Sequence, residues 1–137
     1  MRTFLDTNVL VYMFDANAPG KQRIARHLYE TGVASGVAIL STQVLQEFYV
    51  TVTRKLGTPL AEEDAESVVR DFALLPVVQI DPPLILAAIG RARRLRVSFW
   101  DALIIDAAIA GGATTLYSED LQDGLEIDGL TIRNPFR

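Results

Sequence analysis

Short apolar runs and longer amphipathic stretches follow one another along this chain. Four of the runs are too short for helices and rich in strand-forming residues, which predicts buried strands at Thr3–Leu5, Val37–Leu40, Val77–Ile80 and Thr114–Tyr117. A further run after the turn at Asp123-Gly124 predicts a last strand, Leu130–Ile132.

Helical stretches separate these strands, as the spacing of their apolar residues and their capping residues indicate. They begin after Asp6, at Lys21, at Ser41-Thr42, after Pro59, after Asp81 and at Ser98, and three of them are predicted to end at Gly32, Gly57 and Gly111-Gly112. Helices between consecutive strands require parallel crossovers and a sheet that is covered on both faces. We therefore predict a three-layer α/β/α fold with a central, mostly parallel sheet of four to five strands.

Composition adds limits to this picture. The 137 residues are expected to form a single domain, residues 1–137, with a substantial core. No apolar run is long enough to span a bilayer, and the start of the chain lacks the features of a signal peptide, so the expected location is the cytoplasm. The chain has no cysteine, which excludes disulfides, thiolate chemistry and cysteine-ligated zinc.

The net charge of -4 argues against a generally basic nucleic-acid binder. Two local clusters of basic residues nevertheless leave nucleic acid open as a partner. One comprises Lys21, Arg23 and Arg26, and the other comprises Arg91, Arg93, Arg94 and Arg96. The second cluster provides candidates for contacts with a nucleic-acid backbone, although a solvated helix end explains it equally well.

Acidic residues stand where the predicted strands end. Asp6 follows the first strand directly, Glu47 lies less than two turns into the helix after the second, and Asp120 follows the fourth within three residues. The carboxyl ends of parallel strands share one edge of a sheet, which is where open α/β sheets bind ligands. Asp101 opens the helix before the fourth strand, and it reaches this edge only if that helix starts near the end of the first strand.

Each of these acids also has a plainer interpretation. Asp6 and Asp101 suit the N-terminal ends of helices. Asp120 and Asp123 are of a type common in turns, and a glutamate such as Glu47 is usually solvated. Four carboxylates at one edge would, however, repel one another unless cations neutralised them. Oxygen ligands of this kind suit Mg²⁺ or Mn²⁺.

Two further residues narrow the chemistry. His27, the single histidine, is predicted on the surface of a helix, which makes a histidine-based mechanism unattractive. Asp106 lies on the same helix as Asp101 but five residues further on, so we expect it to point away from Asp101 and either to have a partner of its own or to lie at the rim of the site.

Four stretches together resemble the PIN-domain family, in the order and spacing that this family shows: FLDTNVLVY, STQVLQEFYV, SFWDALIIDAA and TLYSEDLQDG. The similarity covers essentially the whole chain and is closest to the VapC-type toxins of bacterial toxin–antitoxin pairs. It implies a magnesium-dependent endoribonuclease, in which a metal-activated water cleaves RNA. The acidic set of the site would be Asp6, Glu47, Asp101 and Asp120.

The resemblance also implies roles for individual side chains. Asp6 and Asp101 would bind the principal metal ion directly, whereas Glu47 and Asp120 would hold its waters or a second ion. The family often has Asn or Asp where Asp120 stands. Its supporting positions match Thr7, Ser41, Ser118 and Asp123. The expected partners are an RNA substrate, a cognate antitoxin that occupies the groove of the site, and a second copy of the chain in a homodimer; no membrane is involved.

The residues also allow alternative functions to be weighed. A haloacid-dehalogenase-like phosphatase would need a second Asp where Asn8 stands and a late lysine, but no lysine follows Lys55. A phosphoacceptor receiver domain needs the same late lysine. From a different class, the chain could be a non-catalytic interaction module with the PIN fold, against which the intact set of four acids counts.

Overall fold

The computed structural model describes the whole chain, residues 1–137, and contains one six-stranded sheet. The strand order is β3-β2-β1-β4-β6-β5, and every neighbouring pair is parallel except β5 with β6. The strands are β1 (Arg2–Leu5), β2 (Ala38–Ser41), β3 (Val77–Val78), β4 (Ala113–Tyr117), β5 (Glu126–Ile127) and β6 (Leu130–Arg133). The first strand of the chain thus lies near the middle of the sheet.

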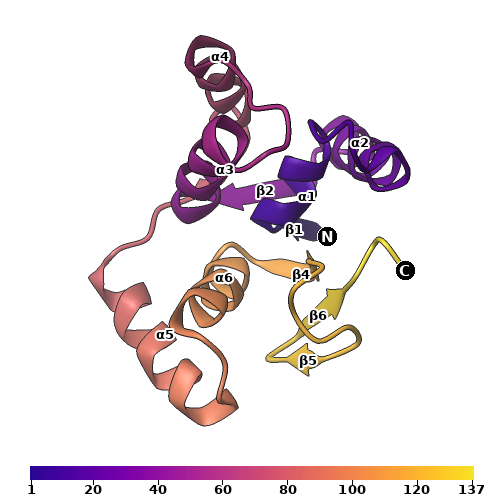
Figure 1. Cartoon of the computed structure of the whole chain (residues 1–137). Coiled ribbons are helices and arrows are strands. Elements are labelled where there is room, and N and C mark those ends of the chain that lie inside the picture. Colours follow the sequence, from indigo (N-terminus) through magenta and orange to yellow (C-terminus); the bar gives the residue numbers. More distant parts are fainter.

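Six helices cover the two faces of this sheet, as Figure 1 shows. They are α1 (Thr7–Tyr12), α2 (Pro19–Ala34), α3 (Thr42–Arg54), α4 (Glu62–Phe72), α5 (Pro82–Leu95) and α6 (Phe99–Ala110). The first four pack together in the upper part of Figure 1, and α5 and α6 pack together at its lower left. The predicted three-layer α/β/α architecture is confirmed.

The core lies between these layers because the central strands are buried on both faces. Phe4 and Leu5 of β1, Leu40 of β2 and Leu116 of β4 are at most 1% exposed. From the helix side, Phe48 of α3 is completely buried against them. A parallel sheet covered on both faces needs such continuous apolar strands, and burying each large side chain contributes about 1.5–3 kcal/mol.

The structure differs from the sequence-based prediction at several element ends and in the number of strands. α3 ends at Arg54, before Gly57, and β3 covers only Val77–Val78 of the predicted Val77–Ile80. Gly32 does not end its helix, because α2 continues to Ala34. A Cβ at Gly32 would lie 3.2 Å from the Cβ of Ala38, so this glycine serves the close packing of α2 on β2. The sheet also has a sixth strand, β5, which is only two residues long and therefore gives no periodicity to recognise.

Helix starts follow directly on strand ends at two places, and this arrangement brings the site together. β1 runs into α1 with Asp6 as the N-cap, and β2 runs into α3 with Ser41 as the N-cap. α6 begins with Ser98 as its N-cap, whose hydroxyl accepts from the backbone N–H of Asp101 at 3.0 Å. None of the helices combines the length and the apolar character that crossing a bilayer requires.

Candidate active site

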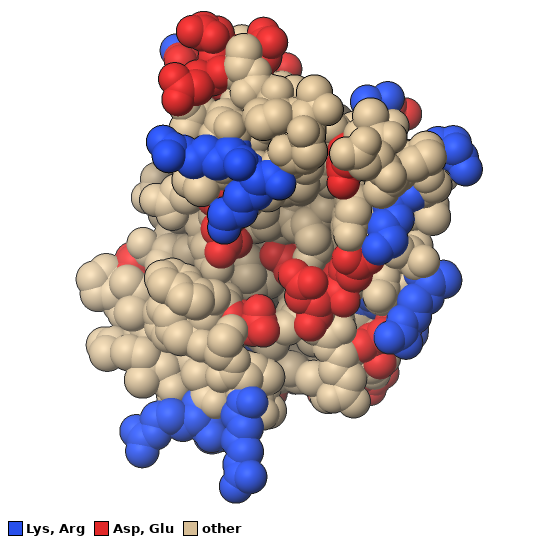
Figure 2. Space-filling model, viewed as in Figure 1, with Lys and Arg blue, Asp and Glu red and all other residues tan.

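Acidic side chains gather in a hollow at the carboxyl edge of the sheet. Figure 2 shows them in the middle of this face, between the helices α1 and α3 on one side and α6 on the other. Asp6 comes from the end of β1, and Asp120 from the loop after β4. Because β1 and β4 are parallel neighbours, the backbone N–H of Asp6 donates to the carbonyl of Tyr117 at 3.0 Å. The two loops that carry these acids therefore start side by side.

Asp6 is the most buried of the four acids, with 6% of its surface exposed. Its Oδ1 accepts from the backbone N–H of Thr7 at 2.7 Å, and its Oδ2 accepts from the hydroxyl of Ser118 at 2.7 Å. Burial raises the pKa of Asp6 to about 7, and the charges of Glu47 and Asp120 add to this increase although the two hydrogen bonds oppose it. Asp6 thus caps α1 and also lies close to the other acids, so its role as a helix cap leaves its predicted role in the site open.

Glu47 is held at both of its carboxylate oxygens. Its Oε1 accepts from the hydroxyl of Thr7 at 2.7 Å, and its Oε2 accepts from the side-chain amide of Gln43 at 3.3 Å. Thr7 follows Asp6 directly in the chain, whereas Glu47 lies one turn after Gln43 on α3. These bonds fix the glutamate toward the hollow, so the interpretation of Glu47 as a freely solvated helix residue does not describe this structure.

Asp120 is exposed and is joined to Asp6 by shared partners. The side-chain amide of Asn8 donates to Oδ2 of Asp120 at 3.1 Å and lies 3.5 Å from Oδ2 of Asp6. The hydroxyl of Ser118 accepts from the backbone N–H of Asp120 at 3.1 Å while it donates to Asp6. Asn8 and Ser118 therefore place both acids in one hydrogen-bonded network.

Asp101 joins the group electrostatically, from the other side of the sheet. Partial burial raises the pKa of Asp101, and the negative charges of Asp120 and Glu47 raise it further. The same two acids raise the pKa of Asp6. The start of α6 thus lies within reach of the charges of Glu47 and Asp120, and the side-chain amide of Gln43 lies 3.3 Å from the carbonyl oxygen of Trp100.

Replacing Asp101 by Asn is expected to stabilise the metal-free protein slightly. The change removes a charge that Asp120 and Glu47 repel, and because Asp101 is partly exposed the gain is at most about 1 kcal/mol. The check is a pair of thermal melts in EDTA and in saturating magnesium, in which the variant should also gain less from magnesium.

A lower melting temperature of the Asp101→Asn variant in EDTA, together with an undiminished magnesium shift, would contradict this prediction. In that case Asp101 would act only on the dipole of α6, where its loss costs about 0.3–1 kcal/mol.

A second network fixes the loop between Ser118 and Asp120. Glu119 accepts from Lys21 at 2.5 Å and from the hydroxyl of Tyr12 at 2.7 Å. The Lys21 ammonium also lies 4.8 Å from the centre of the Tyr12 ring, and Phe136 packs edge-on against that ring. The salt bridge with Lys21 and the hydrogen bond with Tyr12 lower the pKa of Glu119 against the opposing effect of its burial. One of the basic residues of the first cluster is thus already paired.

The other supporting positions have structural partners. The hydroxyl of Ser41 is completely buried and caps α3 by accepting from the backbone N–H of Val44 at 3.4 Å. Asp123 lies further along the loop, where its Oδ1 accepts from the backbone N–H of Asn134 at 2.9 Å. No hydrogen bond joins Ser41 or Asp123 to the four acids.

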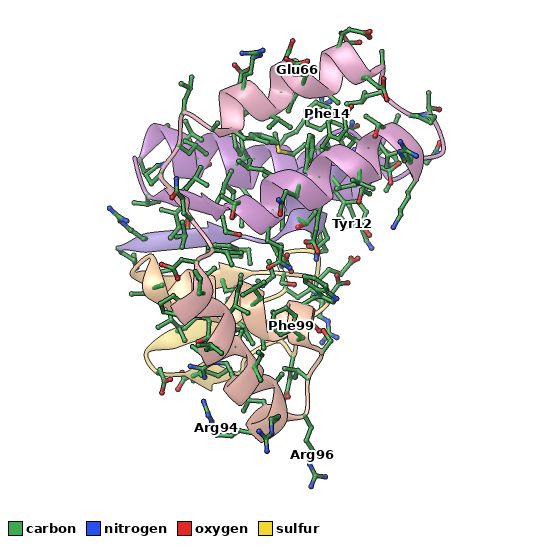
Figure 3. All side chains as sticks on the ribbon, turned by 90° about the vertical axis from the view of Figure 1, so that its left-hand side faces the viewer. Tyr12, Phe14, Glu66, Arg94, Arg96 and Phe99 are labelled. Atoms are coloured by element: carbon green, nitrogen blue, oxygen red, sulfur yellow. The ribbon has the colours of Figure 1, made fainter.

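The arginine cluster of α5 is divided by the fold. Arg91 donates to Asp106 and to Asp128, each at 3.0 Å, and its side chain is 11% exposed. Of the two alternatives for Asp106, the structure shows the partnered one. Arg91 is already paired with two carboxylates, which makes it a poor candidate for binding phosphate. Figure 3 shows Arg94 and Arg96 at the far end of α5, pointing away from the protein and from Tyr12.

A groove of about 660 Å³ extends from the acids along the surface between α1 and α3. Thr7, Glu47 and Asp120 line it where it meets the site. Lys55, the residue that caps the end of α3, is the one basic residue in its lining and forms no salt bridge. The groove is therefore acidic where it meets the site and carries a free positive charge as well.

The donor set fits a hard divalent cation in its chemistry. All four side chains offer oxygen, and the raised pKa values of Asp6 and Asp101 show that added positive charge would stabilise their ionised forms. As the side chains stand, no group of three or more lies at distances that would enclose an ion. Mg²⁺ tolerates this because it keeps several of its waters and needs only one or two carboxylates.

Two residues of the site escaped the sequence analysis. Asn8 was weighed only as a departure from the phosphatase pattern, yet it connects Asp6, Asp120 and the backbone of Glu119. Gln43 lies just after the predicted helix start at Ser41-Thr42 and is buried beside Glu47. The separation of four residues between Gln43 and Glu47 was the available indication, because such pairs face each other on a helix.

Comparison with known proteins places the chain in a family. The sequence profile of the PIN domain matches residues 3–122. The chain therefore belongs to the PIN domain family, and its fold is the PIN fold. No relative was found among proteins with curated descriptions.

Solved structures with the same fold belong to bacterial toxin–antitoxin systems. A toxin–antitoxin complex from Klebsiella pneumoniae superposes with a TM-score of 0.72 at 16% identity, covering 97% of both chains. DNA-bound VapBC from Salmonella typhimurium gives a TM-score of 0.67 at 21% identity over 98% of both chains. VapC20 from Mycobacterium tuberculosis, a toxin that cleaves the sarcin-ricin loop, gives 0.62 at 21% identity over 86% of this chain and 89% of that one.

Proposed function

We propose that this protein is a magnesium-dependent endoribonuclease, the toxin of a type II toxin–antitoxin pair. The observation that carries the proposal is that Glu47 and Asp120 lie close enough to Asp6 and to Asp101 for their charges to raise the pKa of both. Such crowding of like charges is unfavourable in itself and becomes useful when a cation and a phosphate are bound. VapC20, a toxin with the same fold that cleaves the sarcin-ricin loop, supports the choice of RNA as substrate.

The four acidic side chains would have different roles in the reaction, according to their positions. Asp6, which Ser118 and the backbone of Thr7 hold rigidly, and Asp101 would bind the metal ion. When bound, the ion would neutralise charge on the scissile phosphate and lower the pKa of a water. Glu47 and Asp120 would orient water beside it, as the donors on Glu47 and the Asn8 contact to Asp120 support. No protein nucleophile is needed.

Cleavage of a mixed RNA pool is expected in magnesium or manganese and should disappear in EDTA. The physical reason is that four carboxylates repel a phosphate unless a cation lies between them. The measurement is gel analysis of RNA incubated with pure protein, with metal added back after chelation as the control. Undiminished cleavage in excess EDTA would overturn the metal mechanism, and the absence of cleavage under all conditions would favour a non-catalytic PIN-fold module.

Lys55 is expected to bind the RNA backbone, in place of the arginine cluster. It lies free in the groove that leads to the acids, whereas Arg91 is paired and Arg94 points away from the site. Lys55→Gln should weaken RNA binding and reduce the log–log salt slope by about one unit. The measurement is RNA binding at several salt concentrations, in the presence of magnesium and in an Asp6→Asn background that does not cut.

Arg94→Gln is the matched control for Lys55→Gln, because it removes one exposed positive charge far from the groove. A slope that falls with Arg94→Gln and not with Lys55→Gln would place the RNA over α5 instead.

The proposed partners are an antitoxin protein and a second copy of the chain. The antitoxin rests on the toxin–antitoxin complexes that share the fold, and the homodimer rests on the family resemblance of the sequence. Size-exclusion chromatography with light scattering tests the dimer. A small reading frame directly upstream, whose product co-purifies with this chain and blocks cleavage, would support the antitoxin.

A further inference from the structure

Gln43 is a buried polar residue next to the acids, and it uses its side chain in an unusual way. It lies in the first turn of α3 and is 4% exposed. Its amide nitrogen, which has two hydrogens to donate, lies 3.3 Å from Oε2 of Glu47 and 3.3 Å from the carbonyl oxygen of Trp100. Trp100 directly precedes Asp101, so this one amide connects Glu47 to the start of the helix that carries Asp101.

The amide oxygen of Gln43 is left without a partner. Rotating the amide by half a turn would not help, because the oxygen would then face two other acceptors, the carboxylate of Glu47 and the carbonyl of Trp100. An unpaired buried acceptor is costly. A methionine, which has a similar length and a weakly polar sulfur, would fill the same space without that cost. Supplying two N–H donors at this position therefore costs stability, because it leaves the amide oxygen of Gln43 unpaired.

The donors of Gln43 complete the hold on Glu47. The other oxygen of that carboxylate accepts from Thr7, which follows Asp6. Through these contacts Glu47 is tied to the end of β1 by Thr7 and to the start of α6 by Gln43. Without Gln43, Glu47 keeps one donor and is free to turn about it.

We propose that Gln43 is a positioning residue, which holds Glu47 and the start of α6 at the separation that the metal site and the substrate require. The inference rests on the proposed function, since it names a residue that supports the same site. Gln43 acts through Glu47 and Trp100 and contacts neither the phosphate nor the metal.

The test compares Gln43→Met with Gln22→Met. Gln22 lies on α2 and donates to the carbonyl of Met13 at 3.2 Å, away from the acids. Gln43→Met should lower kcat for RNA about tenfold or more with little change in KM, as losses around metal ligands do, while its melting temperature in EDTA stays equal to or above that of the wild type. Gln22→Met should leave kcat unchanged and should not raise the melting temperature.

A second measurement does not depend on cleavage. The increase in melting temperature on adding magnesium should be smaller in Gln43→Met than in the wild type. In a Glu47→Ala background the same substitution should cause a smaller further reduction, because only its contact with Trp100 is left to lose. The magnesium-induced shift in melting temperature tests the role of Gln43 even if RNA proves not to be the substrate.

Three results would overturn the inference. The first is an unchanged kcat together with an unchanged magnesium shift in Gln43→Met. The second is a fall in melting temperature in EDTA that accounts for the lost activity, which would make Gln43 a structural residue only. The third is a full further loss of the magnesium shift in the Glu47→Ala background. If the wild type shows neither cleavage nor a magnesium shift, the proposed function fails and the positioning role fails with it.

Discussion

The Asp6→Asn variant is expected to lose RNA cleavage, by at least about 100-fold, while it keeps the fold of the wild type. The metal ion that Asp6 would bind supplies several kcal/mol of charge stabilisation to the transition state, and each 1.4 kcal/mol corresponds to about a factor of ten in rate. Asn is nearly isosteric, and its amide can still meet the hydroxyl of Ser118 and the backbone N–H of Thr7. The measurement is cleavage in magnesium, with the circular dichroism spectrum as a check on folding.

Asp71→Asn is the matched control for this experiment, because Asp71 is exposed at the end of α4 and away from the hollow. It should cleave RNA as the wild type does. Cleavage by Asp6→Asn at the wild-type rate would remove Asp6 from the mechanism and with it the central part of the proposed site.

Much of the fold could be predicted because its strands are short, apolar and separated by helices. Phe4-Leu5 and Ile39-Leu40 are buried on both faces of a parallel sheet, which leaves a continuous apolar run in the sequence. β5 could not be predicted in the same way, because two residues carry no periodicity and the strand exists only through its pairing with β6. Gly32 was wrongly predicted as a helix end for a related reason: its role is a close packing contact with Ala38 on the next strand, which the apolar pattern does not reveal.

The residues of the candidate site also fall into those that could be predicted from the sequence and those that could not. Asp6 and Asp120 follow strands that are parallel neighbours, so topology alone predicts that they share an edge. The place of Asp101 depends on how α6 packs against the sheet, which the order of elements does not determine. The arginines of α5 looked equivalent in the sequence, but Arg91 differs from the others because the β5–β6 turn brings Asp128 to it. Contacts between distant segments decide these cases.

The largest stability effect is expected from the pH dependence of the metal-free protein. The pKa of Asp6 is raised by burial from 3.8 to about 7. Between these values the folded protein holds a proton that the unfolded chain releases, so the free energy of unfolding falls as the pH rises through this window. The slope is about 1.4 kcal/mol per pH unit, which amounts to about 4 kcal/mol across the window. Above pH 7 the contribution of Asp6 stays constant.

The Asp6→Asn variant tests this contribution, because Asn cannot ionise and the groups that are not coupled to Asp6 titrate alike in both proteins. In EDTA, the melting temperature of the variant should exceed that of the wild type by an amount that grows from pH 4 to pH 7 and then levels off, reaching about 10 °C at about 3 °C per kcal/mol. Saturating magnesium should narrow the gap at pH 7.5, because the ion binds the folded wild type and neutralises the buried charge. A gap that stays constant from pH 4 to pH 8 would mean that the Asp6 carboxylate is ionised without cost in the fold, and the electrostatic argument for a cation in the hollow would then fail.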